Sequence, residues 1–438
     1  MKIFVAILFA FSPIAVSAAQ SDASARIDEI LNEAYAANKV APNEPIDDEV
    51  FLRRIYLDVA GRIPSLAEAK EFLNSSDPDK RSSLIDELLE SEAAVSHSFN
   101  FWADILRLSE YLGNNRLQTY AYSFWLKDAL RRNVPYDELV KELITARGYI
   151  WENGATGYYH RDRGMPLDNM SNTIRVFLGT RMECAQCHDH PFDRWTQMDY
   201  YKMAAFSYSM DARLYAPEGR TAVAEYQNAF MKEARERAPD GEVKVGSPDY
   251  LKYRAINQVN ADLFAFMKFI LTRETPQELK LPHDYQYSDA KPHDVVAPVT
   301  MFGGEIKADS VENLVDAYAD WMTSPENSRF TRVITNRLWK RAMGRGVVEP
   351  VDEIMDHTAA NNPELWDFLN RRMKELDYDM RAFMRDIYHT DAYQRELWRD
   401  DIPLGTPYHF PGPVMRRLSS EQLWGPWRFQ NRITICQA

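Results

Sequence analysis

The sequence is poor in cysteine, with only 3 in 438 residues. Three thiols cannot crosslink a chain of this length, so a small disulfide-stapled scaffold is excluded. Basic residues are also in deficit, with 52 Lys and Arg against 65 Asp and Glu and a formal net charge of −13. A nucleic-acid-binding surface needs a Lys/Arg surplus to neutralise phosphates, so we expect no nucleic-acid partner.

Long apolar runs are missing after residue 20, and we therefore expect no transmembrane anchor. At the N-terminus, Met1 and Lys2 precede an apolar stretch over residues 3–16, and small residues follow at 17–19. A basic start, a short apolar run and small residues at its end are the pattern of a secretory signal peptide. The sequence therefore predicts a signal peptide over residues 1–19 and export to the periplasm or the extracellular space.

Helical patterns dominate the rest of the chain. Asp47, Asp48 and Glu49 predict the start of a helix that Gly61 ends, and Ser65 followed by Glu68 predicts a capping box. We expect a mainly α fold: two helical units joined by a mixed segment with a few short strands. The expected divisions are a helical lead over 20–46, a first helical domain over 47–210, a connecting segment over 211–309 and a second helical domain over 310–438.

The connecting segment differs from the two helical units in its residue pattern. It contains charged or apolar helical patterns over residues 222–237 and 251–271 and then a proline-punctuated stretch over 281–302. Residues alternate in polarity within that stretch, which favours either two or three short strands or an extended linker.

The feature of this sequence that is most specific for chemistry is a C-x-x-C-H motif at Cys184, Cys187 and His188. Two thiols three residues apart can form thioethers to both vinyl groups of a haem, and the adjacent imidazole can then ligate the iron. Covalent haem attachment is expected outside the cytoplasm, which agrees with the signal peptide. The motif therefore predicts a haem c and, with it, electron transfer to a redox partner protein.

Three other interpretations of the same residues stay open. Cys184, Cys187, His188 and His190 could form a zinc-like Cys2His2 site, because borderline-soft metals take mixed thiolate and imidazole ligands. Such a site would fit an enzyme or a binding module that acts on extracellular polymers. The C-x-x-C pair could also be a redox-active dithiol, or a structural disulfide in a scaffold.

A six-coordinate haem needs a second axial ligand, and we expect Met198 or His160 in that role. The other candidates are Met165, Met170, Met203, Met210 and His190. Asp189 or Asp193 is expected to orient an imidazole by hydrogen bonding.

Several segments of the chain carry a resemblance to a known family. They are Phe51-Leu52-Arg53-Arg54-Ile55-Tyr56-Leu57-Asp58, Gly61-Arg62-Ile63-Pro64, Phe101-Trp102, Phe177-Leu178-Gly179 and the run over residues 184–193. The region over 47–210 resembles the planctomycete-type cytochrome c-like domain of unknown function. Residues 329–339, 344–352 and 416–423 resemble that family's usual C-terminal partner domain.

The resemblance implies a haem c and electron transfer outside the cytoplasm, without a defined biochemical role. The chain lacks the separate N-terminal cytochrome module of many relatives, and the residues after Leu423 differ from the helical continuation seen there. We therefore expect the partner domain to be truncated. The sequence contains no nucleophile elbow, phosphate loop or H-E-x-x-H motif, so it assigns neither an enzymatic activity nor an oligomeric state.

Overall fold

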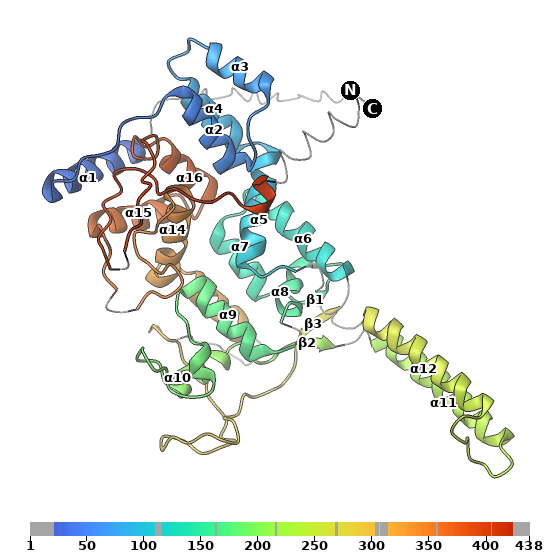
Figure 1. Ribbon diagram of the computed structural model, residues 1–438. Helices are drawn as coiled ribbons and strands as arrows, with labels where there is room; N and C mark the ends of the chain where they lie inside the picture. Colours follow the sequence, from blue (N-terminus) through green and yellow to red (C-terminus); the bar gives the residue numbers. More distant parts are fainter. Residues whose placement is uncertain are drawn as a thin grey trace, which may run out of the picture.

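The computed structural model describes residues 22–109, 116–162, 164–214, 217–267, 270–302, 306, 314–355, 358–403 and 405–423. The predicted signal peptide and Cys436 lie outside these residues. Helices form most of the described chain, as the mainly α prediction requires (Figure 1). None of the helices in the described part is both long and apolar enough to cross a membrane.

The first part of the chain folds into a series of short helices. They are α1 (Asp22–Asn38), α2 (Asp48–Ile55), the π-helix η1 (Tyr56–Ala60), α3 (Leu66–Asn74), α4 (Lys80–Leu89), α5 (Glu92–Ile105), α6 (Arg116–Arg131), α7 (Tyr136–Ile144), the 3-10 helix η2 (Gly154–Thr156), α8 (Gly157–His160), α9 (Pro166–Leu178), the 3-10 helix η3 (Glu183–Gln186) and α10 (Gln197–Ala204). The second part contains α11 (Pro217–Arg237), α12 (Pro248–Met267), α13 (Leu314–Thr323), α14 (Ser328–Met343), α15 (Pro363–Glu375) and α16 (Met380–Tyr388).

Local sequence signals set several helix ends. The Asp47 carboxylate accepts a hydrogen bond of 2.9 Å from the Val50 N–H, and Gly61 ends η1 with a φ of 66°. Ser65 and Glu68 form the expected capping box before α3. These side chains and glycines satisfy or replace the backbone groups that a helix end leaves unpaired.

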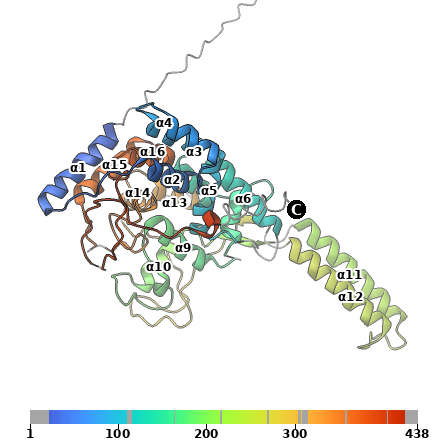
Figure 2. The same cartoon turned by 45° about the horizontal axis from the view of Figure 1, so that its top comes forward.

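Three short strands that are far apart in the sequence form a small antiparallel sheet. Its strands are β1 (Gly148–Tyr149), β2 (Met210–Leu214) and β3 (Leu271–Glu274), in the order β1-β3-β2. Helices α11 and α12 connect β2 to β3 and extend from the body as a hairpin (Figures 1 and 2). Residues 281–302 contain no strand, only a bridge between Lys280 and Val295, so the linker alternative holds there.

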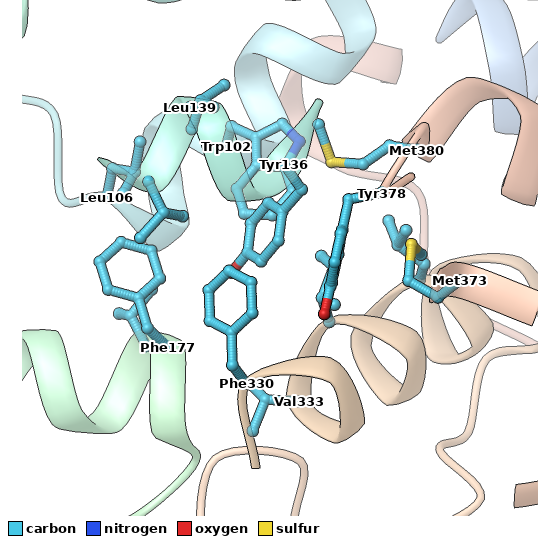
Figure 3. Close-up of a cluster of buried hydrophobic side chains, with 14 of the residues drawn as sticks. Trp102, Leu106, Tyr136, Leu139, Phe177, Phe330, Val333, Met373, Tyr378 and Met380 are labelled. Carbon is cyan, nitrogen blue, oxygen red and sulfur yellow. The ribbon is translucent and has the colours of Figure 1, made fainter. Parts of the chain in front are cut away.

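One hydrophobic core contains side chains from both predicted helical units. Tyr136 of α7 lies 5.4 Å from Trp102 of α5 and 5.0 Å from Phe330 of α14, measured between ring centroids (Figure 3). Its backbone N–H donates to the carbonyl oxygen of Tyr378, just before α16. Helix α1 packs on α15 and α16, and its Ser24 hydroxyl donates to the Asp386 carbonyl oxygen at 2.8 Å. The two predicted helical units are therefore packed together through buried side chains.

Candidate functional site

The two cysteines of the C-x-x-C-H motif lie in a tight turn that follows helix α9. Gly179 ends α9 with a φ of 59°, and η3 then carries Cys184. The N–H groups of Cys187 and His188 both donate to the Cys184 carbonyl oxygen, at 3.2 and 3.3 Å. Both thiols are free and exposed, whereas Ala185 between them is fully buried. The buried alanine holds the turn on the core while the sulfur atoms stay accessible.

The ring nitrogens of His188 have distinct roles. Nδ1 lies 2.7 Å from the carbonyl oxygen of Asp189. Because a carbonyl oxygen can only accept, the proton of the neutral ring resides on Nδ1, and Nε2 keeps its lone pair. The side chain is exposed, so Nε2 can reach a metal centre. This is the tautomer that a metal-ligating histidine adopts when a backbone carbonyl orients it.

His190 is held in the opposite tautomer. Its Nδ1 accepts a hydrogen bond of 3.3 Å from the Phe192 N–H, which places the proton of the neutral ring on Nε2. Its backbone N–H also donates to the Trp195 carbonyl oxygen at 2.8 Å. In the described part of the chain, no group of three or more His, Cys, Asp or Glu side chains is arranged to hold a metal ion.

A partly buried hydrogen-bond network fixes the loop between the cysteines and helix α10. The Asp189 carboxylate accepts from the N–H of Gln197, the first residue of α10, at 2.9 Å. The Gln197 side chain is buried and donates to the Gln186 carbonyl oxygen at 3.1 Å. The Asp189 N–H donates to the Tyr287 hydroxyl oxygen at 2.7 Å, so the linker over 281–302 also supports the loop.

The carboxylates of Asp189 and Asp193 make other contacts than the hydrogen bond to an imidazole that we expected from the sequence. The backbone carbonyl of Asp189, and not its carboxylate, contacts the His188 imidazole. The Asp193 carboxylate accepts from the Arg194 N–H at 2.8 Å, within the loop itself. Neither carboxylate has a hydrogen bond to a histidine ring in the described residues.

Aromatic side chains surround the loop unevenly. Trp195 is buried, contacts Phe302 edge-to-face at 5.4 Å and stacks under the Arg194 guanidinium at 4.5 Å. Phe192 is 83% exposed at the tip of the loop. Tyr201 lies near Cys187, and burial, followed by the proximity of that thiol, raises the pKa of its hydroxyl. The loop therefore rests on an aromatic base and opens to solvent on the side of the cysteines.

The candidates for a second axial ligand lie in different surroundings. Met198 is half-buried in the first turn of α10, directly after the loop. His160 is fully buried in another part of the core, with its Nε2 3.2 Å from the Thr272 hydroxyl of strand β3. The remaining methionines divide into a half-exposed one, Met165, and the buried Met170, Met203 and Met210.

The charged residues next to the turn are largely paired with one another. A cavity of about 690 Å³ runs along α9 and is lined by both arginines and carboxylates. Arg175 lies 3.7 Å from the Glu183 carboxylate, and Arg181 lies 3.3 Å from that of Asp352. The second pair links the chain just before the turn to the segment after α14, a contact between residues 171 positions apart that the sequence pattern did not indicate.

Comparison with known families agrees with the expected domain pair. Residues 26–212 match the family PSCyt2, described as a protein of unknown function (DUF1549), and residues 316–425 match PSD1, also described as a protein of unknown function (DUF1553). The two family models match successive parts of the chain. The PSCyt2 segment contains the whole C-x-x-C-H loop, and neither description mentions haem. No curated protein and no solved structure matches the chain.

Proposed function

We propose that this chain is an exported c-type haem protein that transfers electrons to or from an extracytoplasmic partner or substrate. The observation that carries the proposal is the setting of His188: its Nδ1 lies 2.7 Å from a backbone carbonyl oxygen, and the residue is exposed, which leaves Nε2 as the nitrogen for a ligand bond. That nitrogen is the one that would ligate the iron, directly after two thiols that are both exposed.

On the side of the protein, the attachment chemistry needs two thiols that the porphyrin can reach. Each S–H group would add across one vinyl group of the porphyrin, forming a C–S bond with transfer of the thiol hydrogen to the other vinyl carbon and no leaving group. Cys184 and Cys187 are unpaired and exposed on one turn, so neither has to be released from another bond first. The bound haem would supply reversible one-electron chemistry at the iron.

The surrounding residues would then shield and tune the site. Met198 is our candidate for the second axial ligand, because it is half-buried and lies directly after the loop. The network of Asp189, Gln197 and Tyr287 would keep the loop and the His188 ring in place. Phe192, which is 83% exposed, would provide apolar surface beside the porphyrin ring.

The competing zinc-like site of Cys184, Cys187, His188 and His190 fits the geometry less well. His190 would have to release the Phe192 N–H and reorient before it could donate a lone pair alongside His188. A structural disulfide is also less well supported, because both thiols are free. Both alternatives remain outcomes that the experiment below distinguishes.

The test is expression of the full chain in a host with haem-attachment machinery, followed by visible spectroscopy and metal analysis. We expect a Soret band that survives acid-acetone extraction. A Cys184→Ser, Cys187→Ser double variant should lose it, whereas His190→Gln should keep it. His188→Ala should retain covalently bound colour with an altered spectrum, because only the iron ligand is removed. A colourless protein that carries stoichiometric zinc, lost in His190→Gln, would instead establish the metal site.

A further inference from the structure

A second cavity, of about 480 Å³, shares no lining residue with the cysteine loop. It lies between α2 with its extension η1, helix α5 and the segment over 413–422. Positions 50, 53, 54 and 57 of the first helix line it, as do positions 97, 100, 101 and 104 of α5. These spacings place each set on one face of its helix, so the cavity is the space between two facing helices. We call it the arginine cleft.

The arginine cleft joins the segments that mark the two families. The Asp58 carboxylate of η1 accepts a hydrogen bond of 2.7 Å from the Arg416 guanidinium. The carbonyl oxygen of Leu57 accepts one of 2.8 Å from the Gln422 side chain. Thus the Phe51–Asp58 run of the PSCyt2 segment and the Arg416–Leu423 run of the PSD1 segment meet here. A π-helix such as η1 is rare and is frequently found at functional sites.

Arg341, near the end of α14, supplies a cation without a carboxylate partner among the described residues. Its guanidinium donates to the Ser98 hydroxyl at 3.3 Å and lies 4.5 Å from the centre of the Phe101 ring. Burial lowers the pKa of Arg341 from its ordinary value, but an arginine side chain keeps its charge in proteins. The same side chain also lines an adjoining cavity of about 320 Å³.

The balance of charge in the cleft is opposite to that of the chain. Five arginines line it (Arg53, Arg54, Arg341, Arg416 and Arg417), together with the three carboxylates of Asp58, Asp104 and Glu421. The Asp58 charge is already compensated by Arg416. The whole chain has a formal net charge of −13, so a local surplus of cations calls for a specific explanation.

Apolar side chains also line the cleft, together with the polar His97, Asn100, Ser419 and Gln422. Leu57, Phe101 and Leu418 contribute carbon surface, with Val50, Leu397 and Val414 beside them. Small-molecule sites have this composition: mostly apolar walls with a few convergent polar groups. Guanidinium groups bind carboxylate, sulfate and phosphate groups through paired hydrogen bonds.

We propose that the arginine cleft binds an organic anion whose carboxylate, sulfate or phosphate head pairs with Arg341 and whose apolar body lies against Phe101 and Leu57. Arg53 and Arg417, exposed at the entrance, attract the head group. This binding does not depend on haem, and it therefore stands or falls separately from the proposed electron transfer.

The test uses the full chain and 8-anilinonaphthalene-1-sulfonate, an aromatic sulfonate whose fluorescence rises when it is bound. Octanoate, octyl sulfate and octyl phosphate then compete for the probe, and the three arms identify the preferred head group. 1-Octanol is the neutral control with the same apolar body. Arg341→Gln is the central variant, and Arg371→Gln, an exposed arginine on α15 outside the cleft, is its matched control. The double variant Arg53→Gln, Arg417→Gln alters only exposed positions and tests the cleft without disturbing buried groups.

We expect Arg341→Gln to weaken probe binding by about tenfold or more, in line with the loss of a charge-assisted hydrogen bond. The double variant should weaken it less and reduce its dependence on salt. The octyl anions should displace the probe at concentrations at which 1-octanol does not. Equal probe affinity in wild type, Arg341→Gln and Arg371→Gln, or displacement by 1-octanol as effective as by the anions, would overturn the proposal.

Discussion

His160 is a buried titratable group with a consequence for stability. It is fully buried beside Thr272, and burial, the largest cause, lowers the pKa of its imidazole to about 3. The unfolded chain, with a pKa near the ordinary 6.5, therefore binds more protons than the folded chain between about pH 6.5 and pH 3. The stability that neutral His160 provides is fully present above this window and is lost as the pH falls through it.

We predict that His160→Gln reduces the acid sensitivity of the fold. In wild type this group should lower the free energy of unfolding by about 1.4 kcal/mol per pH unit within the window, and the variant should show a smaller slope. Urea unfolding at pH 7, 6 and 5 measures the difference. His283→Gln, at an exposed histidine, is the control and should follow wild type. Parallel slopes in wild type and His160→Gln would contradict the assignment.

The exposure of Cys184 and Cys187 leads to a prediction about the reactivity of their thiols. Both are free and exposed, so in protein made without haem attachment they should react rapidly with a disulfide reagent. In a Cys436→Ser background, titration with 5,5′-dithiobis(2-nitrobenzoic acid) under native conditions should count two thiols. Thiols that appear only after reduction would show that the structural disulfide is correct.

Sequence reasoning worked at these residues where the interaction is local. The Asp47 cap and the Ser65–Glu68 capping box depend on neighbours three residues apart, and both were predicted. The contact of Tyr287 with Asp189 joins residues 98 positions apart, and no periodic pattern encodes such a pairing. The Asp189 carbonyl that orients His188 was missed for a different reason: every residue has a carbonyl group, so composition cannot single one out.

Among the elements, helix α9 determines where the cysteine turn lies. Gly179 ends α9 in the left-handed region, and a Cβ at this position would lie 2.6 Å from a methyl carbon of Val333 on α14. The close approach of α9 to α14 therefore requires glycine twice, once for the backbone conformation and once for space. The turn with Cys184 begins four residues later, so packing against α14 positions the candidate site.

Gly179→Ala should lower the free energy of unfolding by about 2–5 kcal/mol, from left-handed strain of about 1–2 kcal/mol and overpacking of about 1–3 kcal/mol. Urea unfolding monitored by circular dichroism gives this value. Gly241→Ala is the matched control, because its φ is also positive, at 73°, and its added Cβ would meet nothing within 4 Å. If the two variants lose equal stability, the contact with Val333 does not constrain the helix.

Helices were easier to predict than strands for physical reasons. The 3.6-residue pattern of α9 or α14 repeats over several turns, so its signal accumulates. Strand β1 contains only two residues and shows no alternation. The helical pattern over residues 251–271 overlaps β3 at Leu271, and no pattern indicates the rest of this four-residue strand. The C-x-x-C-H spacing picks out the candidate residues of the cysteine loop, which stay a prediction. The sequence did not indicate the arginine cleft, because its walls come from five separate segments.

For the whole molecule, the shared core means that the two families' segments should unfold together. Tyr136 packs between aromatic rings of α5, α9 and α14. Tyr136→Ala should therefore cost about 3–5 kcal/mol while a single unfolding transition is kept. Urea unfolding followed by both tryptophan fluorescence and circular dichroism tests this, since the two signals should change together.

Tyr136→Phe is the control for that variant. The hydroxyl is buried without a hydrogen-bond partner in the described part of the chain, so its removal should leave the stability equal to or above that of wild type. Two separate transitions in wild type would show that the PSCyt2 and PSD1 segments are independent domains. The predicted connecting segment over residues 211–309 would then separate two units that fold independently.

The central claim is that a porphyrin is attached through two sulfur atoms beside His188, and peptide mass spectrometry addresses it most directly. Trypsin cleaves after Arg181 and Arg194, which releases a peptide of residues 182–194 that contains Cys184, Cys187, His188 and His190 and no other cysteine. From protein made with haem-attachment machinery, we predict this peptide at its calculated mass plus one haem, with both cysteines blocked to alkylation. The peptide at its unmodified mass, with both cysteines alkylated or joined to each other, would contradict the account.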